Sequence, residues 1–392
     1  MTLRLICRSL SILLCGAAAV HAQPRFAAHE IATGLRGGYQ VVVADVNHDG
    51  KPDLIAVASN LPELLWFENP TWTRHVLASG FTGLINVAAT DLDGDGIPEI
   101  AVASGFSTRP DQSAGIVAIL THGADVRQPW TVREIDRVPS SHRLRWYTDA
   151  SGQKWLINSP LAAAIAQPPN YDGATPIFAY RAPEWKREFI FSAEHGVVHA
   201  IEPIQGMLCT SCVLSAGFAG IHRYEHANGE WSNTTIAVGD PTPVPKGGSS
   251  DVAVGRLRTV AGNGQDVEIT ILAAIEPWHG NQLVVYRLDG TGKRYVRKVV
   301  DSTIVDGHAI VMADLDGDGT DEIIIGQRGG THRVWIYRQT SIDVWSRSTL
   351  DDGRMAAAGC AAADFNGDGR IDIACIGTAT ANLKWYQNLG RE

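Results

Sequence analysis

The sequence predicts an all-β fold, a seven-bladed β-propeller whose N-terminal strand pairs with the last blade and closes the ring. Three observations lead to this prediction. An acidic turn recurs between short apolar runs, the unit around it repeats about every fifty residues, and the outer strand that the last unit lacks is found at the N-terminus. Units of this length that hold four short strands are typical of propellers.

The acidic turn has the pattern DVNHDG, DLDGDG or DFNGDG, and its four clear copies begin at Asp45, Asp91, Asp314 and Asp364. Runs rich in Val, Ile and Ala flank each copy without helical spacing, which indicates buried strands. The first and last copies are 319 positions apart (364 − 45), or six steps of about 53 residues. Degenerate copies fill the gap around Asp149, around Glu202 and around Asp251 or Arg256. Seven units are therefore expected.

The outer-strand pattern is a Trp- or Tyr-led strand that follows the aromatic third strand of a unit. The last third strand, LKWYQN at 383–388, has no such strand after it. The segment RFAAHEIATGL at 25–35 matches the outer strand WTRHVLASGF at 72–81. We therefore expect the N-terminal strand to complete the seventh blade, which leaves no exposed sheet edge.

Residues 1–22 have the features of a secretory signal peptide: a basic start, an apolar stretch at 10–20 and small residues before Gln23. The expected mature chain is a single propeller, 23–392, secreted or periplasmic. A lipid anchor at Cys15 is the less favoured alternative. No other segment has the length of a membrane span, and the net charge of -9 argues against a nucleic-acid partner. The oligomeric state is left open.

Four cysteines follow the signal segment. Cys209 and Cys212 form a CxxC pair, which suits a local disulfide, a redox pair or half of a zinc site. The zinc alternative is weak because no second CxxC exists. Cys360 and Cys375 lie among small apolar residues, so we expect them to be buried thiols of the core.

The acidic turns predict Ca²⁺ sites, since oxygen ligands alternate and Gly stands at the sixth position. The predicted ligands are Asp45, Asn47, Asp49 and Asp53; Asp91, Asp93, Asp95 and Glu99; Asp314, Asp316, Asp318 and Glu322; and Asp364, Asn366, Asp368 and Asp372. EF-hands are excluded because strands flank the turns and no Glu stands at position twelve. Metal-free Asx-turns are the alternative. We expect structural calcium in at least two of the four turns.

A second candidate site lies on the opposite face of the ring, where second-to-third-strand turns and the starts of first strands converge. The candidate catalytic residues there are His142, Arg143, His195 (with His199 as the alternative), Glu276, His279, His308 and Arg328. Two insertions, 104–115 and 158–176, are expected to wall a pocket. Each histidine alone is more often an ordinary surface or core residue, but several directed to one axis favour a site.

Such a pocket suits a polyhydroxylated or anionic ligand. A histidine would remove a proton beside a carbonyl, and Arg would steady the developing negative charge, so that a β-hydroxyl is lost. The imidazoles would alternatively hold a catalytic divalent metal. Nucleophilic hydrolysis has little support because the chain has no GxSxG motif and no Cys–His pairing.

The acidic turns with their flanking strands resemble FG-GAP/VCBS repeats. Longer phrases resemble the propeller of aldos-2-ulose dehydratases and related secreted bacterial proteins: SHRLRW at 141–146, SSDVAVGRL at 249–257, IEPWHGNQLVVY at 275–286, DGHAIVMADLDGDGTDEIIIGQRGG at 306–330 and FNGDGRIDIACIGTATANLKWYQN at 365–388. That resemblance implies dehydration of keto-sugars and places His142, His279 and His308 in a sugar site. The family pairs its propeller with cupin domains, which are not expected in this chain.

Two hypotheses follow. The first is a secreted carbohydrate-active propeller that binds and dehydrates a keto-sugar in the axial pocket. The second is a non-catalytic, calcium-stabilised module that binds glycans or proteins. Histidines gathered in one pocket would favour the first, and histidines scattered round the rim would favour the second.

Overall fold

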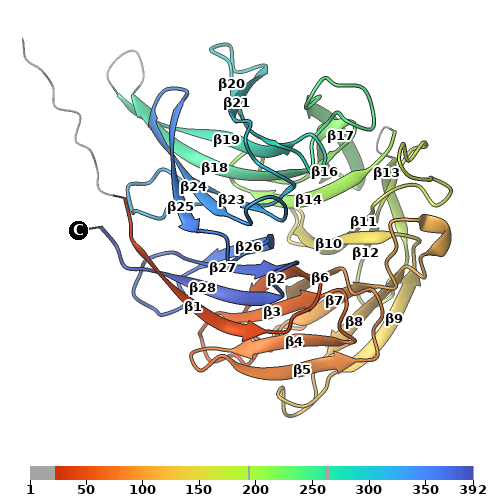
Figure 1. Cartoon of the computed structure of the whole chain (residues 1–392). Coiled ribbons are helices and arrows are strands. Elements are labelled where there is room, and N and C mark those ends of the chain that lie inside the picture. Colours follow the sequence, from red (N-terminus) through yellow and green to blue (C-terminus); the bar gives the residue numbers. More distant parts are fainter. Residues whose placement is uncertain (1–22, 193–194, 261–264, 392) are drawn as a thin grey trace, which may run out of the picture.

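The computed structural model describes residues 23–192, 195–260 and 265–391. Seven four-stranded antiparallel sheets are arranged in a ring in this part of the chain (Figure 1), and its one helical turn is η1 (Pro110–Gln112). The predicted seven-bladed propeller is confirmed. The predicted signal peptide, 1–22, lies outside the described residues.

Each blade runs from the axis outward in chain order. Blade one consists of β2 (Gly38–Ala44), β3 (Asp53–Ala58), β4 (Glu63–Glu68) and β5 (Thr73–Ser79). Blade two consists of β6 (Asn86–Thr90), β7 (Glu99–Ser104), β8 (Ile116–Thr121) and β9 (Thr131–Arg137). Blade three consists of β10 (Ser141–Thr148), β11 (Lys154–Pro160), β12 (Pro176–Tyr180) and β13 (Glu188–Ser192). Blades four and five are β14 (Val198–Gln205), β15 (Ser211–Gly217), β16 (Gly220–Ala227) and β17 (Glu230–Ala237); and β18 (Asp251–Val260), β19 (Asp266–Glu276), β20 (Gln282–Leu288) and β21 (Tyr295–Asp301). Blade six is β22 (Gly307–Ala313), β23 (Glu322–Gln327), β24 (Val334–Ser341) and β25 (Val344–Asp351).

The seventh blade joins the two ends of the chain. Its strands are β26 (Ala357–Ala363), β27 (Asp372–Gly377), β28 (Asn382–Asn388) and, outermost, β1 (Phe26–Thr33). β1 pairs antiparallel with β28, from Phe26 opposite Asn388 to Thr33 opposite Asn382. The closure predicted from the matching outer strands is therefore present.

Apolar contacts between neighbouring blades form the core. Second strands such as β3, β7, β23 and β27 are buried along their whole length. One cluster joins blades one and two through fully buried residues that include Trp66, Leu77 and Ile100. Each fully buried large apolar side chain contributes about 1.5–3 kcal/mol, so the interfaces between blades dominate the stability of the ring.

A polar clamp recurs across several of these interfaces. A third-strand Tyr donates its hydroxyl hydrogen bond to an Asp near the end of the preceding blade, and a Lys or Arg binds the same carboxylate. The pairs are Tyr180 with Asp136 (2.7 Å), Tyr337 with Asp301 (2.8 Å) and Tyr386 with Asp351 (2.9 Å), and the cations are Arg187, Arg347 and Lys384. Each buried hydroxyl is thus satisfied by a neighbouring blade, which ties the blades together.

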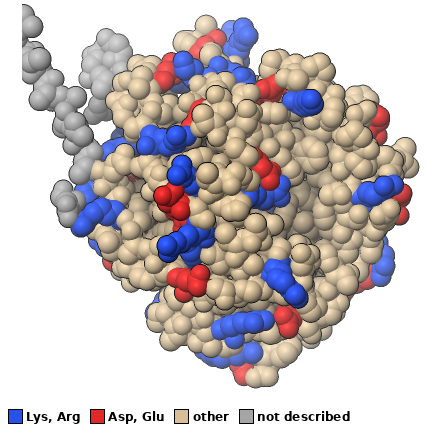
Figure 2. All heavy atoms as spheres, viewed as in Figure 1, with Lys and Arg blue, Asp and Glu red and all other residues tan. Residues whose placement is uncertain are grey.

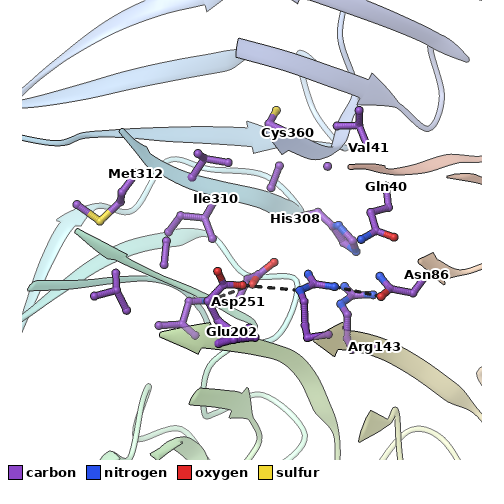
Figure 3. A pocket seen from close by; sticks show the side chains of 18 of the residues that line it. Gln40, Val41, Asn86, Arg143, Glu202, Asp251, His308, Ile310, Met312 and Cys360 are labelled. Atoms are coloured by element: carbon purple, nitrogen blue, oxygen red, sulfur yellow. Dashed lines mark hydrogen bonds and ion pairs between the residues drawn. The ribbon is translucent and has the colours of Figure 1, made fainter. Parts of the chain in front are cut away.

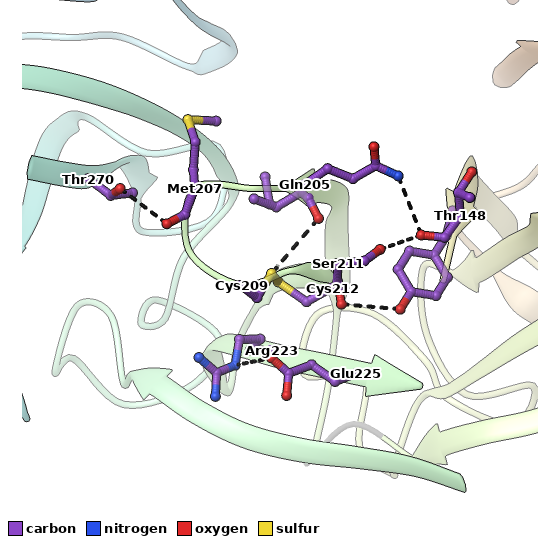
Figure 4. The surroundings of a disulfide bond; sticks show 11 residues. Thr148, Gln205, Met207, Cys209, Ser211, Cys212, Arg223, Glu225 and Thr270 are labelled. Carbon is purple, nitrogen blue, oxygen red and sulfur yellow. Dashed lines mark hydrogen bonds and ion pairs between the residues drawn. A yellow bond between two sulfur atoms is a disulfide. The ribbon is translucent and has the colours of Figure 1, made fainter. Parts of the chain in front are cut away.

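The four cysteines of the described residues form two disulfides. Cys209, in the turn between β14 and β15, pairs with Cys212 at the start of β15, which selects the local bridge among the three alternatives (Figure 4). Cys360 and Cys375 also pair, so the expectation of free core thiols was wrong. They lie directly opposite each other on β26 and β27, with Cα atoms 4.1 Å apart. This register depends on the intervening turn, which composition alone does not reveal.

Charged side chains of both signs are interspersed over the face shown in Figure 2. Among the described residues, no helix is long and apolar enough to cross a membrane.

Candidate functional site

A repeated β-bulge places the candidate site on the axis. In five of the seven first strands, the pairing with the second strand skips one residue close to the strand's start. The skipped residues are Tyr39, His142, His199, His308 and Ala358. A bulge redirects the side chain of its extra residue, and here four of these residues have rings that meet at the centre of the propeller.

Four imidazoles form the cluster, and His199 lies at its middle. The ring centroid of His199 is 5.0 Å from that of His142, 4.8 Å from that of His279 and 5.0 Å from that of His308. His279 and His308 are 5.2 Å apart. Side-chain nitrogens of His199, His279 and His308 all lie within 4.8 Å of one another. Blades four, five and six thus bring three nitrogen ligands to one point.

Hydrogen bonds set the tautomers of two of these rings. His308 Nδ1 donates to the Ala358 carbonyl (2.7 Å), and His199 Nδ1 donates to the Ser250 carbonyl (3.0 Å). Each neutral ring therefore keeps the lone pair on Nε2. His308 Nε2 is buried and has no hydrogen-bond partner among the described residues. Metal-binding histidines typically donate one ring N–H to a backbone carbonyl and use the other ring nitrogen to bind the metal.

His279 reaches the cluster from the turn between β19 and β20. Its backbone N–H donates to Ser250 Oγ (3.2 Å), and its Nε2 lies 3.1 Å from His199 Nε2. Arg328 donates from Nη2 to His279 Nδ1 (3.2 Å) and to Asp306 Oδ1 (2.9 Å). Ser250 thus binds the ring of His199 and the backbone of His279, and Arg328 binds the Nδ1 side of the His279 ring.

Burial keeps these imidazoles neutral. Desolvation, with the positive charge of Arg143 or Arg328 as the next cause, lowers the pKa of His199 and His308 well below the usual value. Desolvation and then Arg328 lower the pKa of His279 to about 3. Neutral imidazole is the form that binds metal. Three such nitrogens are a ligand set typical of a catalytic divalent ion such as Zn²⁺, whose fourth position is taken by water or substrate.

His142, Arg143 and Tyr39 form a second group against the imidazoles. Arg143 Nη1 donates to the Tyr39 hydroxyl (3.1 Å) and to His142 Nε2 (2.9 Å), and the same hydroxyl lies 2.9 Å from His142 Nε2. His142 Nε2 is an acceptor because guanidinium only donates. Burial, followed by the charge of Arg143, lowers the pKa of His142.

The structure brings five of the seven predicted catalytic residues together: His142, Arg143, His279, His308 and Arg328. His195 is the first exception, because it is exposed in the loop before β14 and makes none of the ring contacts described for the cluster. His199, the alternative from the same blade, occupies the bulge instead.

Glu276 is the second exception. Its carboxylate lies inside blade five, where Ser249 (2.9 Å), Tyr286 and Arg297 (2.8 Å) bind it. The side chain is fully buried and serves the packing of that blade.

Tyr39 and Ser250 are site residues that sequence reasoning missed. A sequence signal existed for Tyr39: it is the second residue of its first strand, the position that holds His142, His199 and His308 in other blades. Ser250 precedes its first strand directly.

The two insertions form a lid over the imidazoles on this face, which we call the lid face. Phe106 packs on His142 with ring centroids 5.2 Å apart, and Tyr171 and Phe218 pack on Trp278. An apolar cluster from 161–171, Val197 and Phe218 extends this cover. His142, His199 and His308 are only 1–2% exposed. The insertions therefore cover the site more closely than the pocket walls expected of them.

The acidic turns divide into two kinds. Three predicted ligand residues come within 4.8 Å of one another in the turns of blades two and six, namely Asp91, Asp93 and Glu99, and Asp314, Asp316 and Glu322. In blades one and seven, the last predicted ligand turns away. Both carboxylate oxygens of Asp53 accept backbone N–H groups, and those of Asp372 do the same.

The remaining predicted ligands of the four turns cap their own loops. Side chains of Asp45, Asn47, Asp49, Asp95, Asp318, Asp364, Asn366 and Asp368 accept hydrogen bonds from backbone N–H groups two to five residues later. Arg338 and Arg391 also contact the turn of blade six. Burial, followed by Asp316, raises the pKa of Glu322 to about 8. A bound metal ion would offset the repulsion among the carboxylates of this turn and so allow all of them to be ionised.

Comparison with known proteins agrees with this architecture. FG-GAP-like repeats match at 45–102 and 314–375, an FG-GAP repeat matches at 85–120, and the β-propeller domain of aldos-2-ulose dehydratase matches at 114–289. The curated aldos-2-ulose dehydratase of Phanerodontia chrysosporium is 26% identical over 298 residues. That match covers 67% of this chain and 32% of the relative. The chain is thus a propeller that contains FG-GAP-like repeats at these positions and is similar to the propeller domain of that dehydratase.

Solved structures show the same fold at low identity. A chain of the mitotic checkpoint complex aligns with a TM-score of 0.55 and 10% identity, covering 100% of this chain and 99% of that chain. A chain of BBS1N in complex with ARL6DN aligns with a TM-score of 0.55 and 13% identity, covering 94% and 98%. These likenesses concern the fold alone.

Proposed function

We propose that this protein is an exported, carbohydrate-active propeller that binds a keto-sugar at the axial His/Arg cluster and eliminates water from it with the help of a divalent metal. The observation that carries the proposal is the meeting of His199, His279 and His308, whose nitrogens lie within 4.8 Å. Their burial and their hydrogen-bonded outer nitrogens support metal binding.

The residues divide the work by their chemistry. The three clustered histidines would hold the metal, which when bound supplies Lewis-acid polarisation of a ligand oxygen. Arg143 would stabilise negative charge as it develops on the carbonyl oxygen. His142 Nε2, a neutral acceptor beside Tyr39 and Arg143, would take the proton from the carbon next to that carbonyl. The C–O bond of the β-hydroxyl would then break, a C=C bond would form, and the protonated His142 would return its proton to the leaving hydroxyl, which departs as water. Arg328 would hold His279 in place.

The relative supports a sugar ligand, since its name describes dehydration of an aldosulose. The compartment is part of the proposal: two disulfides among the described residues suit a secreted or periplasmic protein. Structural Ca²⁺ is proposed for the turns of blades two and six, where carboxylates gather.

The test is turnover. We expect metal-loaded protein to convert glucosone or 1,5-anhydrofructose to a product with enone absorbance in the ultraviolet. His308→Ala should abolish this activity, whereas His195→Ala should retain it because His195 lies outside the cluster. A metal-loaded wild-type protein that yields no absorbance with either sugar would contradict the proposed reaction.

A non-catalytic, calcium-stabilised module that binds glycans or proteins is the second candidate. The cover over the imidazoles favours it, since Phe106, Tyr171, Phe218 and Trp278 pack over them on the lid face. Tight glycan binding without turnover in the same experiment would select this alternative.

A further inference from the structure

An axial chamber lies inside the ring on the other side of the imidazoles from the lid (Figure 3). Its volume is about 330 Å³, and Tyr39, Arg143 and His308 line one end of it. Gln205 and Met207 line the other end, where β14 turns into β15 on the face of the acidic turns. Both of these residues are exposed. The chamber therefore leads from solvent at the acidic-turn face to the buried histidines.

The chamber has one polar and one apolar wall. Figure 3 shows Glu202, Asp251, Arg143 and Asn86 along one side and Ile310, Met312, Val41 and Cys360 along the other. A concave site with an apolar surface and a few convergent polar groups is the usual form of a small-molecule site. Its volume lies at the lower end of the range for such sites, about 300–1,000 Å³. This size suits a monosaccharide better than a longer glycan.

Two carboxylates of the chamber have few hydrogen-bond partners among the described residues. The Arg143 Nη1 donor is engaged by Tyr39 and His142, and Arg145 Nη1 donates to Asn86 Oδ1 (3.1 Å) and the Leu144 carbonyl (2.9 Å). By contrast, the nearest cation to Glu202 is Arg145 at 3.8 Å, beyond hydrogen-bond distance. Asp251 accepts only its neighbour's N–H, from Val252 (3.0 Å), among the hydrogen bonds of the described residues.

Open carboxylate oxygens select the ligand. They accept hydrogen bonds from hydroxyl groups, and charge-assisted bonds of this kind are stronger than neutral ones. A sugar acid would place its carboxylate beside Glu202 and Asp251 and be repelled. Burial raises the pKa of Asp251 to about 6 and that of Glu202 to about 7, with Arg143 and Arg145 as the main opposing influences.

A second observation points to a ligand at the inner end. His308 lines the chamber, is 2% exposed, and its Nε2 has no hydrogen-bond partner among the described residues. A ligand in the chamber would thus meet Arg143, Tyr39 and His308 at one end and the two carboxylates along its side.

We propose that this chamber binds a neutral monosaccharide that enters from the acidic-turn face, and that Asp251 and Glu202 accept hydrogen bonds from its hydroxyl groups. The identity of the sugar as a keto-sugar rests on the function proposed above. The binding site itself does not require turnover.

The test measures binding and turnover on the full-length mature protein with Asp251→Asn and Glu202→Gln. Both substitutions keep the shape of the side chain and remove its charge. We therefore expect the melting temperature of each variant to lie within about 4 °C of that of wild type. Titration calorimetry with 1,5-anhydrofructose should show at least about a tenfold rise in Kd for each variant, which matches the loss of one hydrogen bond to a charged group. Glucuronate should bind wild type at least tenfold more weakly than 1,5-anhydrofructose.

A blocking variant tests the route of access independently of charge. Ile310→Trp fills the apolar wall, so it should abolish binding while leaving the metal content of the protein unchanged. Glu230→Gln, an acid-to-amide change at an exposed position of blade four, is the matched control and should bind like wild type.

The outcomes separate this proposal from the reaction. If wild type turns over the sugar and all three chamber variants have wild-type Kd and KM, the chamber is not the site, although the proposed function stands. If the variants weaken binding but wild type never forms an enone, the chamber proposal stands and the reaction is wrong. If wild type binds no neutral monosaccharide at millimolar concentration, the chamber proposal is overturned.

Discussion

The Nε2 atoms of His199 and His279 lie 3.1 Å apart, although 80 positions separate the two residues in the chain. Arg328 donates to Nδ1 of His279, so the neutral ring carries its proton on Nε2 and donates it to His199. His199 can accept because its own proton lies on Nδ1, bound to the Ser250 carbonyl. A single proton thus lies between the Nε2 atoms of His199 and His279, at the position where a metal ion would bind both nitrogens.

This proton should move when metal binds. Nε2 of His279 can bind Zn²⁺ only if its proton shifts to Nδ1, which lies 3.9 Å from Asp306 Oδ1. The ring is already neutral, so we expect a change of tautomer and no loss of a proton from His279. The ¹⁵N NMR spectrum of the histidine side chains at pH 7, recorded with and without Zn²⁺, measures this change. His279→Ala should bind less metal. Full-strength Zn²⁺ binding by that variant would show that His279 is not a ligand.

Removal of either of the other two ligands should weaken metal binding strongly. The affinity for Zn²⁺ should fall in His199→Ala and His308→Ala by more than about 10- to 100-fold, which is the loss typical of residues that only orient a metal ligand. Metal content after dialysis against Zn²⁺ checks this. His195→Ala is the control from the same region of blade four and should keep its metal. Equal metal content in all three variants would refute the site.

Calcium should raise the stability of the ring through blades two and six. An ion at 100 times its Kd adds about 2.7 kcal/mol per site to the free energy of unfolding. Chemical denaturation with Ca²⁺ or with a chelator measures this gain. Asp91→Asn and Asp314→Asn should each reduce the gain more than Asp45→Asn. Among the described residues, three predicted ligands gather in the turns of Asp91 and Asp314 but not in the turn of Asp45. The same unfolding curve with and without Ca²⁺ would contradict the prediction.

Glu68 should make stability depend on pH. It binds Arg127 of blade two, His75 and Asn47, and Arg127 above all lowers its pKa to about 2. A lowered acid pKa stabilises the folded state above the unfolded value, about 4.5, and that gain is lost as the pH falls toward 2. Glu68→Gln should therefore cost on the order of 2 kcal/mol at pH 6 and about half of that or less at pH 3, after allowance for solvent screening.

The control for this prediction is Glu63→Gln on the same strand, whose ion pair with Arg74 is exposed. Its effect should stay within about 0.5 kcal/mol at both pH values. Urea unfolding at pH 6 and pH 3 compares the two variants. A Glu68→Gln penalty that is equal at both pH values would show that the charge of Glu68 is not the cause.

Asp351 should be essential for the last interface of the ring. Its carboxylate accepts hydrogen bonds from Tyr386 (2.9 Å) and Lys384 (2.8 Å), and all three groups are buried. Asp351→Ala leaves a buried ammonium without its counter-charge, which costs about 3–5 kcal/mol. Asp352→Ala, the next residue, is exposed and should cost less than about 0.5 kcal/mol. Denaturant midpoints measure both, and equal values would refute the clamp.

Much of the fold could be predicted because its signals are local. The acidic turns, the buried Val/Ile/Ala runs and the outer strand at 25–35 each follow from neighbouring residues, and counting them predicted seven blades and their closure. Five of the seven candidate catalytic residues gathered at the axis for the same reason: equivalent positions of a repeat point to the same place. The Cys209–Cys212 bridge was among the predicted alternatives because three residues of separation limit the geometry.

The rest depended on register and packing between blades. Whether His195 or His199 faces the axis depends on a bulge that skips one residue, and a shift of one residue in a strand turns a side chain to the opposite face. The same physics places Glu276 inside blade five and Cys360 opposite Cys375. By itself, then, the sequence determined the number, order and closure of the blades, since these follow from contacts within short segments. Only the tertiary structure decided which side chains meet, because that requires distant strands to be aligned to within one residue.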